Sequence, residues 1–137
     1  MAAETKRLGL IELTGKHLLE GLSRMKAFLI DPAARTVTAY NFYGHQDDIA
    51  KAIECSDVHS IRVTSNETLY VDDNGLFNDE KLDHPWELVG YDSPLVGKAL
   101  LLGCDAAGDI VPSNYERIKE MVFWRTEAEA SVMFSWR

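Results

Sequence analysis

The stretch SIRVTSNETLYVDDNG, residues 60–75, decides the fold, because it has the pattern of a strand, a short turn, a second strand and an acidic loop. Apolar residues alternate with polar ones on both sides of the turn: Ile61, Val63, Leu69 and Val71. A two-residue period is typical of a strand that buries one face. The stretch therefore predicts an antiparallel hairpin, to which the rest of the chain is fitted.

The register of this hairpin can be predicted, because residues that lie opposite each other in an antiparallel pair point to the same face. A two-residue turn would mix the apolar and polar faces, whereas a three-residue turn at 65–67 sets Val63 opposite Leu69. The same register sets Arg62 beside Tyr70 on the other face, within cation–π distance. We expect the apolar face to be core and the Arg62–Tyr70 face to be a surface that can bind a partner.

The residues before the hairpin predict another strand pair and a helix. Residues 26–30 are apolar on both faces, as in a strand from the middle of a sheet, and residues 36–42 are rich in β-branched and aromatic types. Pro32 marks a turn between the two. After Gly44, residues 47–53 combine two leading acids with apolar residues at helical spacing, which predicts a short helix lying on one face of the sheet.

Beyond the hairpin, residues 86–91 and 98–104 have the pattern of two further strands. Ser113 and Glu116 match a capping box, which predicts a second helix starting at about residue 114. The tail after residue 127 alternates apolar and polar side chains, and this alternation favours a strand over a helix.

These elements predict an α+β fold, with a mostly antiparallel sheet of about five to six strands and two short covering helices. Residues 25–137 are expected to form a single domain, since 137 residues are enough for one core. Residues 1–24 differ in pattern: Thr14 can cap a short helix, so they are expected to be a helical N-terminal appendage.

The formal net charge is −8, and it is distributed unevenly. From Phe42 to Asp92 twelve acids face three bases, so this segment alone carries −9. Nucleic-acid binding rests on cationic side chains, so we expect no direct nucleic-acid contact. The acids can simply keep the surface soluble, or they can form an acidic face that docks on a host protein with a basic surface. A homodimer stays open.

No pattern in the chain points to catalysis. Cys55 and Cys104 each have a carboxylate neighbour, which raises a thiol pKa, so both are expected to be reduced core thiols rather than nucleophiles. The four histidines are isolated, and only His45, beside Asp47, has acidic neighbours that could share a metal. We therefore expect no catalytic residue, no metal and no cofactor. The apolar runs are far shorter than the roughly 18 residues of a membrane span, which predicts a soluble, cytoplasmic protein.

The aromatic residues of the predicted strands are expected to lie mostly in the core. Should several emerge on one open face, they would form a platform for a partner or a small planar ligand. The candidate binding residues are Arg62, Tyr70, Asp72, Asp73, Tyr40 and Trp86.

Three motifs in order are MKAFLIDP at residues 25–32, LYVDDNGL at 69–76 and PLVGKALLLG at 94–103, the last followed by Asp105 and Gly108. Together they resemble the DUF3846 family, a domain of unknown function found in short proteins of phages, plasmids and bacteria. The resemblance covers residues 25 to 122. It implies an accessory protein of a mobile element, and it brings no catalytic residue.

From these observations we expect a non-enzymatic binding protein of a phage or mobile element, for example an inhibitor that acts on a host defence protein through the acidic surface. The alternative is a binder of a small, nucleotide-type ligand, or an enzyme with an aromatic and carboxylate pocket.

Overall fold

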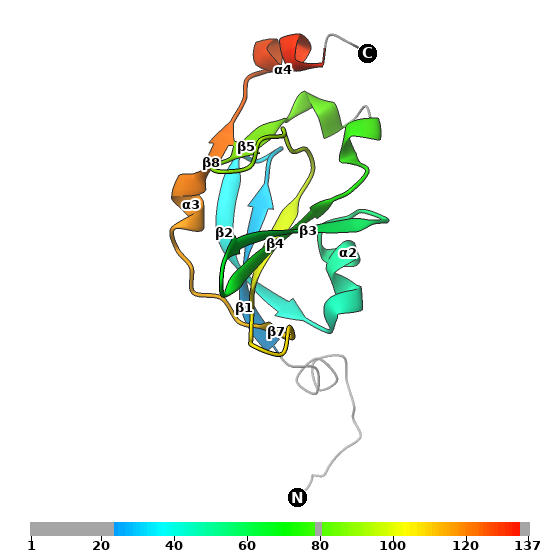
Figure 1. The fold of residues 1–137 in the computed structure, drawn as a ribbon. Coiled ribbons are helices and arrows are strands. Elements are labelled where there is room, and N and C mark those ends of the chain that lie inside the picture. Colours follow the sequence, from blue (N-terminus) through cyan, green and yellow to red (C-terminus); the bar gives the residue numbers. More distant parts are fainter. Residues whose placement is uncertain (1–23, 79–80, 135–137) are drawn as a thin grey trace, which may run out of the picture.

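The computed structural model describes residues 24–78 and 81–134, and its centre is one antiparallel sheet (Figure 1). The strands of this main sheet are β1 (Arg24–Asp31), β2 (Thr36–Tyr43), β3 (Val58–Thr64), β4 (Glu67–Asp72), β6 (Ala99–Cys104) and β7 (Ile110–Val111). Their spatial order is β2-β1-β6-β4-β3, with β7 paired to one end of β6. Every pairing is antiparallel, which confirms the predicted sheet.

Smaller elements cover both faces of the sheet. On one face lie a two-stranded sheet of β5 (Trp86–Leu88) and β8 (Val122–Trp124), and helix α3 (Ile118–Met121). On the other lie the 3-10 turn η1 (Gln46–Asp48) and helix α2 (Ile49–Ala52), as Figure 1 shows. The remaining elements are the 3-10 turns η2 (Gly75–Phe77) and η3 (Lys81–Asp83) and helix α4 (Glu127–Met133). The fold is thus α+β, as predicted.

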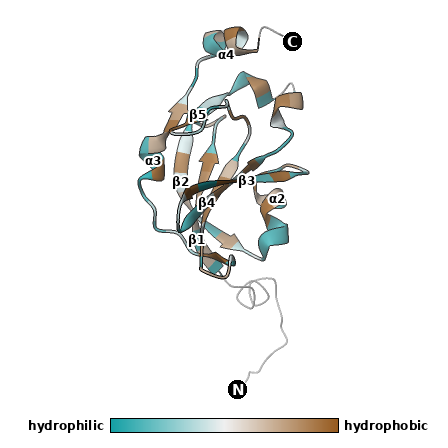
Figure 2. Cartoon of the chain, viewed as in Figure 1, coloured by the Kyte–Doolittle hydropathy of each residue, from teal (hydrophilic) through white to brown (hydrophobic). Residues whose placement is uncertain are grey.

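Strand β6 explains how one sheet supports two cores. All six of its residues are buried, because β1 and β4 flank it and both faces are covered. Leu101 points to the face under β5, and Leu100 and Leu102 point to the face under α2. Figure 2 shows that the central strands are mainly hydrophobic, while α2 carries hydrophobic and hydrophilic residues.

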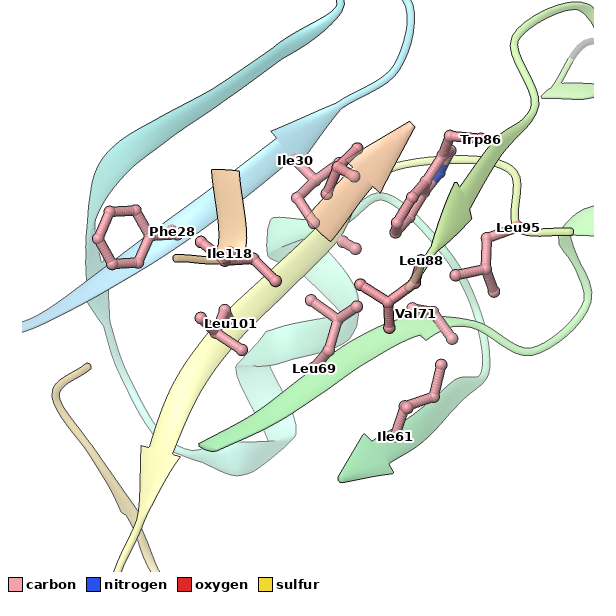
Figure 3. Close-up of a cluster of buried hydrophobic side chains, with 12 residues drawn as sticks. Phe28, Ile30, Ile61, Leu69, Val71, Trp86, Leu88, Leu95, Leu101 and Ile118 are labelled. Carbon is pink, nitrogen blue, oxygen red and sulfur yellow. The ribbon is translucent and has the colours of Figure 1, made fainter. Parts of the chain in front are cut away.

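We call the two clusters the β5 core and the α2 core. The β5 core consists of Phe28, Ile30, Ile61, Leu69, Val71, Trp86, Leu88, Leu95, Ala99, Leu101, Ile118 and Val122 (Figure 3). The α2 core consists of Ala27, Phe42, Ile49, Ile53, Tyr70, Leu100 and Leu102. The first predicted hairpin is confirmed: β1 pairs with β2 along all eight residues and with β6 on its other side. Phe28 and Ile30 of β1 enter the β5 core and Ala27 enters the α2 core, so β1 contributes to both faces of the sheet.

The predicted register of the central hairpin is wrong. Ile61 pairs with Leu69, and Arg62 pairs with Thr68 rather than lying beside Tyr70. The turn has only two central residues and is closed by Thr64 opposite Glu67. A bulge between Arg62 and Thr64 inserts one extra residue into β3, and this insertion restores the alternation of faces that a two-residue turn would otherwise disrupt.

The apolar half of that prediction is largely confirmed. Ile61, Leu69 and Val71 lie together in the β5 core, and Val63, at the bulge, is half-buried against it. Tyr70, however, pairs with Ser60 and is 6% exposed inside the α2 core, whereas Arg62 is at the surface. The surface role inferred for an Arg62–Tyr70 pair therefore loses its structural basis.

The predicted capping box at Ser113 and Glu116 is also wrong. Helix α3 is one turn long and starts at Ile118. The hydroxyl of Ser113 accepts the N–H of Tyr115 at 3.2 Å, and its own N–H donates to the Lys26 carbonyl at 2.8 Å. Ser113 is 1% exposed, so it fastens this segment to β1 instead of capping a helix.

The strand favoured for the tail is replaced by helix α4. Thr126 accepts the N–H of Glu129 at 3.1 Å, and Glu129 accepts the N–H of Thr126 at 2.8 Å, which forms a complete capping box. Ala130 and Phe134, four residues apart, pack on Leu82 and Val96. Helical spacing and a cap thus outweigh the alternation of apolar residues.

The predicted N-terminal appendage, residues 1–24, lies outside the described part of the chain except for Arg24, which is the first residue of β1. Within residues 24–78 and 81–134, every helix is too short to cross a membrane.

Candidate functional site

Two cavities lie at the end of the sheet where β4 leaves it. Cavity A, about 520 Å³, is bounded by α2, the end of β4 and the 3-10 turns η2 and η3. Its walls include Lys51, Glu54, Cys55, Asp72, Phe77 and Lys81. Cavity B, about 180 Å³, has walls that include His59, Asp72, Asp73, Tyr91 and Ser93. Asp72 borders both, so the acidic turn predicted as a candidate site lies between two hollows.

Asp72 is held by a partly buried ion pair. Its side chain is 5% exposed and is paired with Lys81 Nζ, whose side chain is 21% exposed. The second carboxylate oxygen accepts the N–H of Asn74 at 2.9 Å. Lys81 Nζ also donates to the Glu54 carbonyl at 3.2 Å. Asp72 therefore joins η3 and the end of α2 to β4, and its charge is already compensated.

Glu54 closes helix α2 in a conformation that usually belongs to glycine. Its φ is +58°, and its N–H donates to the Lys51 carbonyl at 3.2 Å while the Cys55 N–H donates to the Ala50 carbonyl at 3.0 Å. These two hydrogen bonds form a Schellman motif, whose left-handed position is usually glycine. At this position the side chain of Glu54 makes the backbone conformation strained. The Glu54 carboxylate reaches Lys98 Nζ at 2.5 Å, which lowers the pKa of Glu54 and raises that of Lys98.

Phe77, in η2, is the feature of this region that sequence reasoning missed. It lines cavity A, and 80% of the residue is exposed. The N–H of Phe77 donates to the Asn74 carbonyl at 3.0 Å, so the turn that follows Asp72 fixes its backbone. The available signal was a large apolar residue in an otherwise polar loop.

Asp73 points outward from the same turn and is 57% exposed in its side chain, with His59 Nδ1 at 3.9 Å. Asp57 lies beside it: the Asp57 carbonyl accepts the Asp73 N–H at 2.9 Å, and its carboxylate accepts Asn74 Nδ2 at 2.7 Å. Asp92 is exposed between two residues of the cavity B wall. We call the surface formed by Asp57, Asp73 and Asp92 the acidic end.

The other predicted site residues do not join this surface. Trp86 is fully buried in the β5 core, where Nε1 donates to the Gly97 carbonyl at 3.1 Å. Tyr70 lies in the α2 core, and burial raises its pKa. Tyr40 is half-buried against the same core, and Arg62 donates to the Ser65 carbonyl at 3.2 Å. The rings of Trp86 and Tyr70 thus serve opposite faces of the sheet, as expected for core residues.

Cys55 borders cavity A with a less acidic thiol than usual. Burial is the main cause of its raised pKa, and the negative charge of Asp72 raises it further. The predicted direction of the shift is therefore confirmed, but the carboxylate that contributes is Asp72 and not the sequence neighbour Glu54. A raised pKa leaves little thiolate at neutral pH. Cys55 and Cys104 are both free thiols. In the described residues we find no cluster of three His, Cys, Asp or Glu side chains able to hold a metal.

In a comparison with known families, the model for a domain of unknown function (DUF3846) aligns with residues 25–122. The match begins in β1 and ends at the first residue of β8, so it includes the acidic end and both cavities and leaves out α4. Neither the curated proteins nor the solved structures contain a match to the chain.

Proposed function

Because this chain belongs to the DUF3846 family, whose function is unknown, we propose a function from its own surface: it is a non-enzymatic binding protein that docks on a basic host protein through the acidic end. The setting is a phage or mobile element, as the resemblance implies, and inhibition of a host defence protein is the kind of activity that fits it. The single observation that carries the proposal is the exposed ring of Phe77 beside this acidic surface.

The charges of this region divide into compensated and available ones. Lys81 pairs with Asp72 and Lys98 pairs with Glu54, so these two acids attract a partner only weakly. Asp57, Asp73 and Asp92 are exposed, and none of them has a lysine or arginine nitrogen within 4 Å among the described residues; the His59 ring lies 3.9 Å from Asp73. Uncompensated acids on one surface accelerate association with a basic partner and select against acidic ones.

Phe77 supplies the apolar anchor that charge alone lacks. Binding energy at protein interfaces concentrates in a few large side chains, often aromatic, that enter a pocket of the partner. An exposed phenylalanine ring with polar surroundings matches that role, and burying it gains about 2 kcal/mol from apolar area. Phe77 is linked to the acidic end through Asn74, which bonds both the Phe77 backbone and Asp57.

The test is retention of host proteins on the immobilised chain at low and high salt. We expect one or a few basic proteins to be held at low salt and released as salt screens the charges. Asp57→Asn, Asp73→Asn and Asp92→Asn, combined in one variant, should abolish retention. Phe77→Ala should weaken it strongly and leave the melting temperature nearly unchanged.

A matched control carries the same charge change elsewhere: Asp109→Asn, Glu120→Gln and Glu127→Gln, all exposed and all outside the walls of both cavities. It should retain the same proteins as the wild type. Equal loss in both triple variants would mean that net charge, and not the acidic end, governs binding. An empty eluate from the wild type at low salt would contradict the proposal.

A second candidate is a small planar ligand in cavity A, because Phe77 and two lysines line a space of about 520 Å³. The check is a thermal-shift screen against nucleotides and metal ions. A ligand at 100 times its dissociation constant stabilises a protein by about 2.7 kcal/mol. A shift that Phe77→Ala removes would favour this candidate, and a flat screen would leave the protein-docking proposal ahead.

A further inference from the structure

Strand β2 forms one edge of the main sheet, and its sequence does nothing to protect that edge. All eight residues, TVTAYNFY, pair with β1 on the inner side. On the outer side, β2 has no neighbouring strand among the described residues. None of the eight is charged and none is proline. An open edge of this length presents a row of backbone donors and acceptors to any strand that can lie beside it.

The opposite edge, β3, is protected in the usual ways. It carries the charged Arg62 and an exposed histidine, His59, and the bulge at Val63 twists it away from regular pairing. The two edges therefore differ: one discourages a further strand and the other accepts it. The difference points to β2 as a place where pairing is intended.

We propose that two copies of the chain associate through β2, side by side and antiparallel about a two-fold axis, so that their sheets join into one. A two-fold axis perpendicular to the sheet keeps the faces in register and brings a residue near Ala39 or Tyr40 opposite itself. The residues that then meet are neutral, so the formal charge of −8 causes no direct clash at the joint.

The two ends of β2 carry opposite charges, which favours a second copy over another occupant. Asp47 is exposed in η1 just after the strand, and Arg35 is exposed immediately before it. The Arg35 guanidinium donates to the Arg125 carbonyl at 3.3 Å, a neutral acceptor that leaves its positive charge uncompensated. An antiparallel arrangement places Arg35 of each copy near Asp47 of the other, and the symmetry forms this pair twice. The Asp48 carboxylate at the same end already accepts the His45 N–H at 2.8 Å, so Asp47 is the acid that is available.

A hollow beside β2 gives the added strand something to cover. About 330 Å³ lies open between α2 and four consecutive residues, Tyr40 to Tyr43, with Lys51 on the far wall. Successive side chains of a strand point to opposite faces of the sheet. Because four consecutive residues line this hollow, it must extend to the edge of the strand. Strand addition next to such a hollow combines backbone bonds with side-chain contacts, as in other complexes of this type.

The test is the mass of the full chain in solution, followed by light scattering or sedimentation across the micromolar range. We expect the mass to rise towards twice 15.4 kDa with concentration. Ala39→Lys places two like charges near the axis and should weaken the dimer roughly tenfold or more. Ser60→Lys introduces the same side chain on the exposed edge strand β3 and should leave the dimer intact.

A charge exchange keeps the proposal falsifiable if Ala39→Lys disturbs folding. Arg35→Asp and Asp47→Arg should each weaken the dimer, and the double variant should restore it, because the pair is re-formed with reversed signs. A wild-type chain that stays at 15.4 kDa throughout overturns the proposal. So does a dimer that Ser60→Lys dissociates and Ala39→Lys does not.

Discussion

Lys81 Nζ and the Asp72 carboxylate form an ion pair in which the acid is 5% exposed and the lysine 21%. The pair joins the turn η3 to the end of β4, and Asp72 borders both cavities of the candidate site. The same lysine donates to the Glu54 carbonyl, so three separate segments meet at one ammonium group. The shape of the candidate site therefore depends on a contact that is itself almost closed to solvent.

Lys81→Met should lower the free energy of unfolding by about 2 to 3 kcal/mol, because a nearly buried carboxylate loses its counter-charge. Chemical denaturation at neutral pH measures the change. Asp72→Asn combined with Lys81→Met should cost less than the sum of the two single changes, by on the order of 1 to 2 kcal/mol. Strict additivity in this cycle would show that the pair contributes no coupling.

Glu54→Gly and Glu54→Ala separate backbone strain from the side-chain pair. Glycine adopts φ +58° without strain, which gains about 1 kcal/mol relative to glutamate. Glycine also loses the ion pair with Lys98, and this pair is worth at most about 1 kcal/mol because the Glu54 side chain is 67% exposed. Glu54→Gly should thus be nearly neutral, while Glu54→Ala, which loses the pair and keeps the strain, should be less stable. Thermal and chemical denaturation of both variants measure the difference.

The same pair sets a pH dependence. Because Lys98 lowers the pKa of Glu54, the contribution of Glu54 to stability is present at neutral pH and is lost as the pH falls through that lowered pKa. In Glu54→Gly this part of the acid-side loss should be absent. A marked loss of stability in Glu54→Gly at neutral pH would instead mean that the Lys98 contact is stronger than exposed pairs usually are.

Patterns of apolar residues predicted the five long strands of the main sheet, because burial on one or both faces leaves a period of two or a continuous run. The same patterns missed β7 and β8, extended β5 beyond Leu88 and favoured a strand where α4 forms. They failed where the backbone departs from a regular ladder. The predicted register of the hairpin requires an unbroken β3, and a single bulged residue at Val63 shifts the pairing. At Ser113 the capping pattern is present, but the hydroxyl bonds Tyr115 and the segment is fixed to Lys26.

The candidate site was predicted only in part, for a related reason. The acidic turn was visible in sequence because Asp72 and Asp73 stand next to each other, but nothing in that pattern shows which of the two is buried. Lys81 and Lys98 come from later segments, and only the fold brings them to Asp72 and Glu54. Phe77 was visible in the sequence only as a large apolar residue in a polar loop, and that pattern fits a core as well as a surface.

The corrected register makes its own prediction, because it moves Tyr70 from a surface into the α2 core. Tyr70 is 6% exposed, so Tyr70→Ala should lower the free energy of unfolding by about 3 to 4 kcal/mol, as truncation of a buried ring does. Arg62, exposed on β3, should tolerate alanine within about 0.5 kcal/mol. Had the two side chains lain together on an open face, both changes would have been mild.

Titration of the tyrosines gives an independent check on that placement. Burial raises the pKa of Tyr70, so its phenol should ionise above the ordinary value of about 10, as a late step in the ultraviolet absorbance. Tyr70→Phe should remove this step, while Arg62→Ala, which takes away a nearby positive charge, should move it to higher pH. A Tyr70→Ala variant as stable as the wild type, together with a wild-type titration that lacks the late step, would place Tyr70 at the surface and contradict the register.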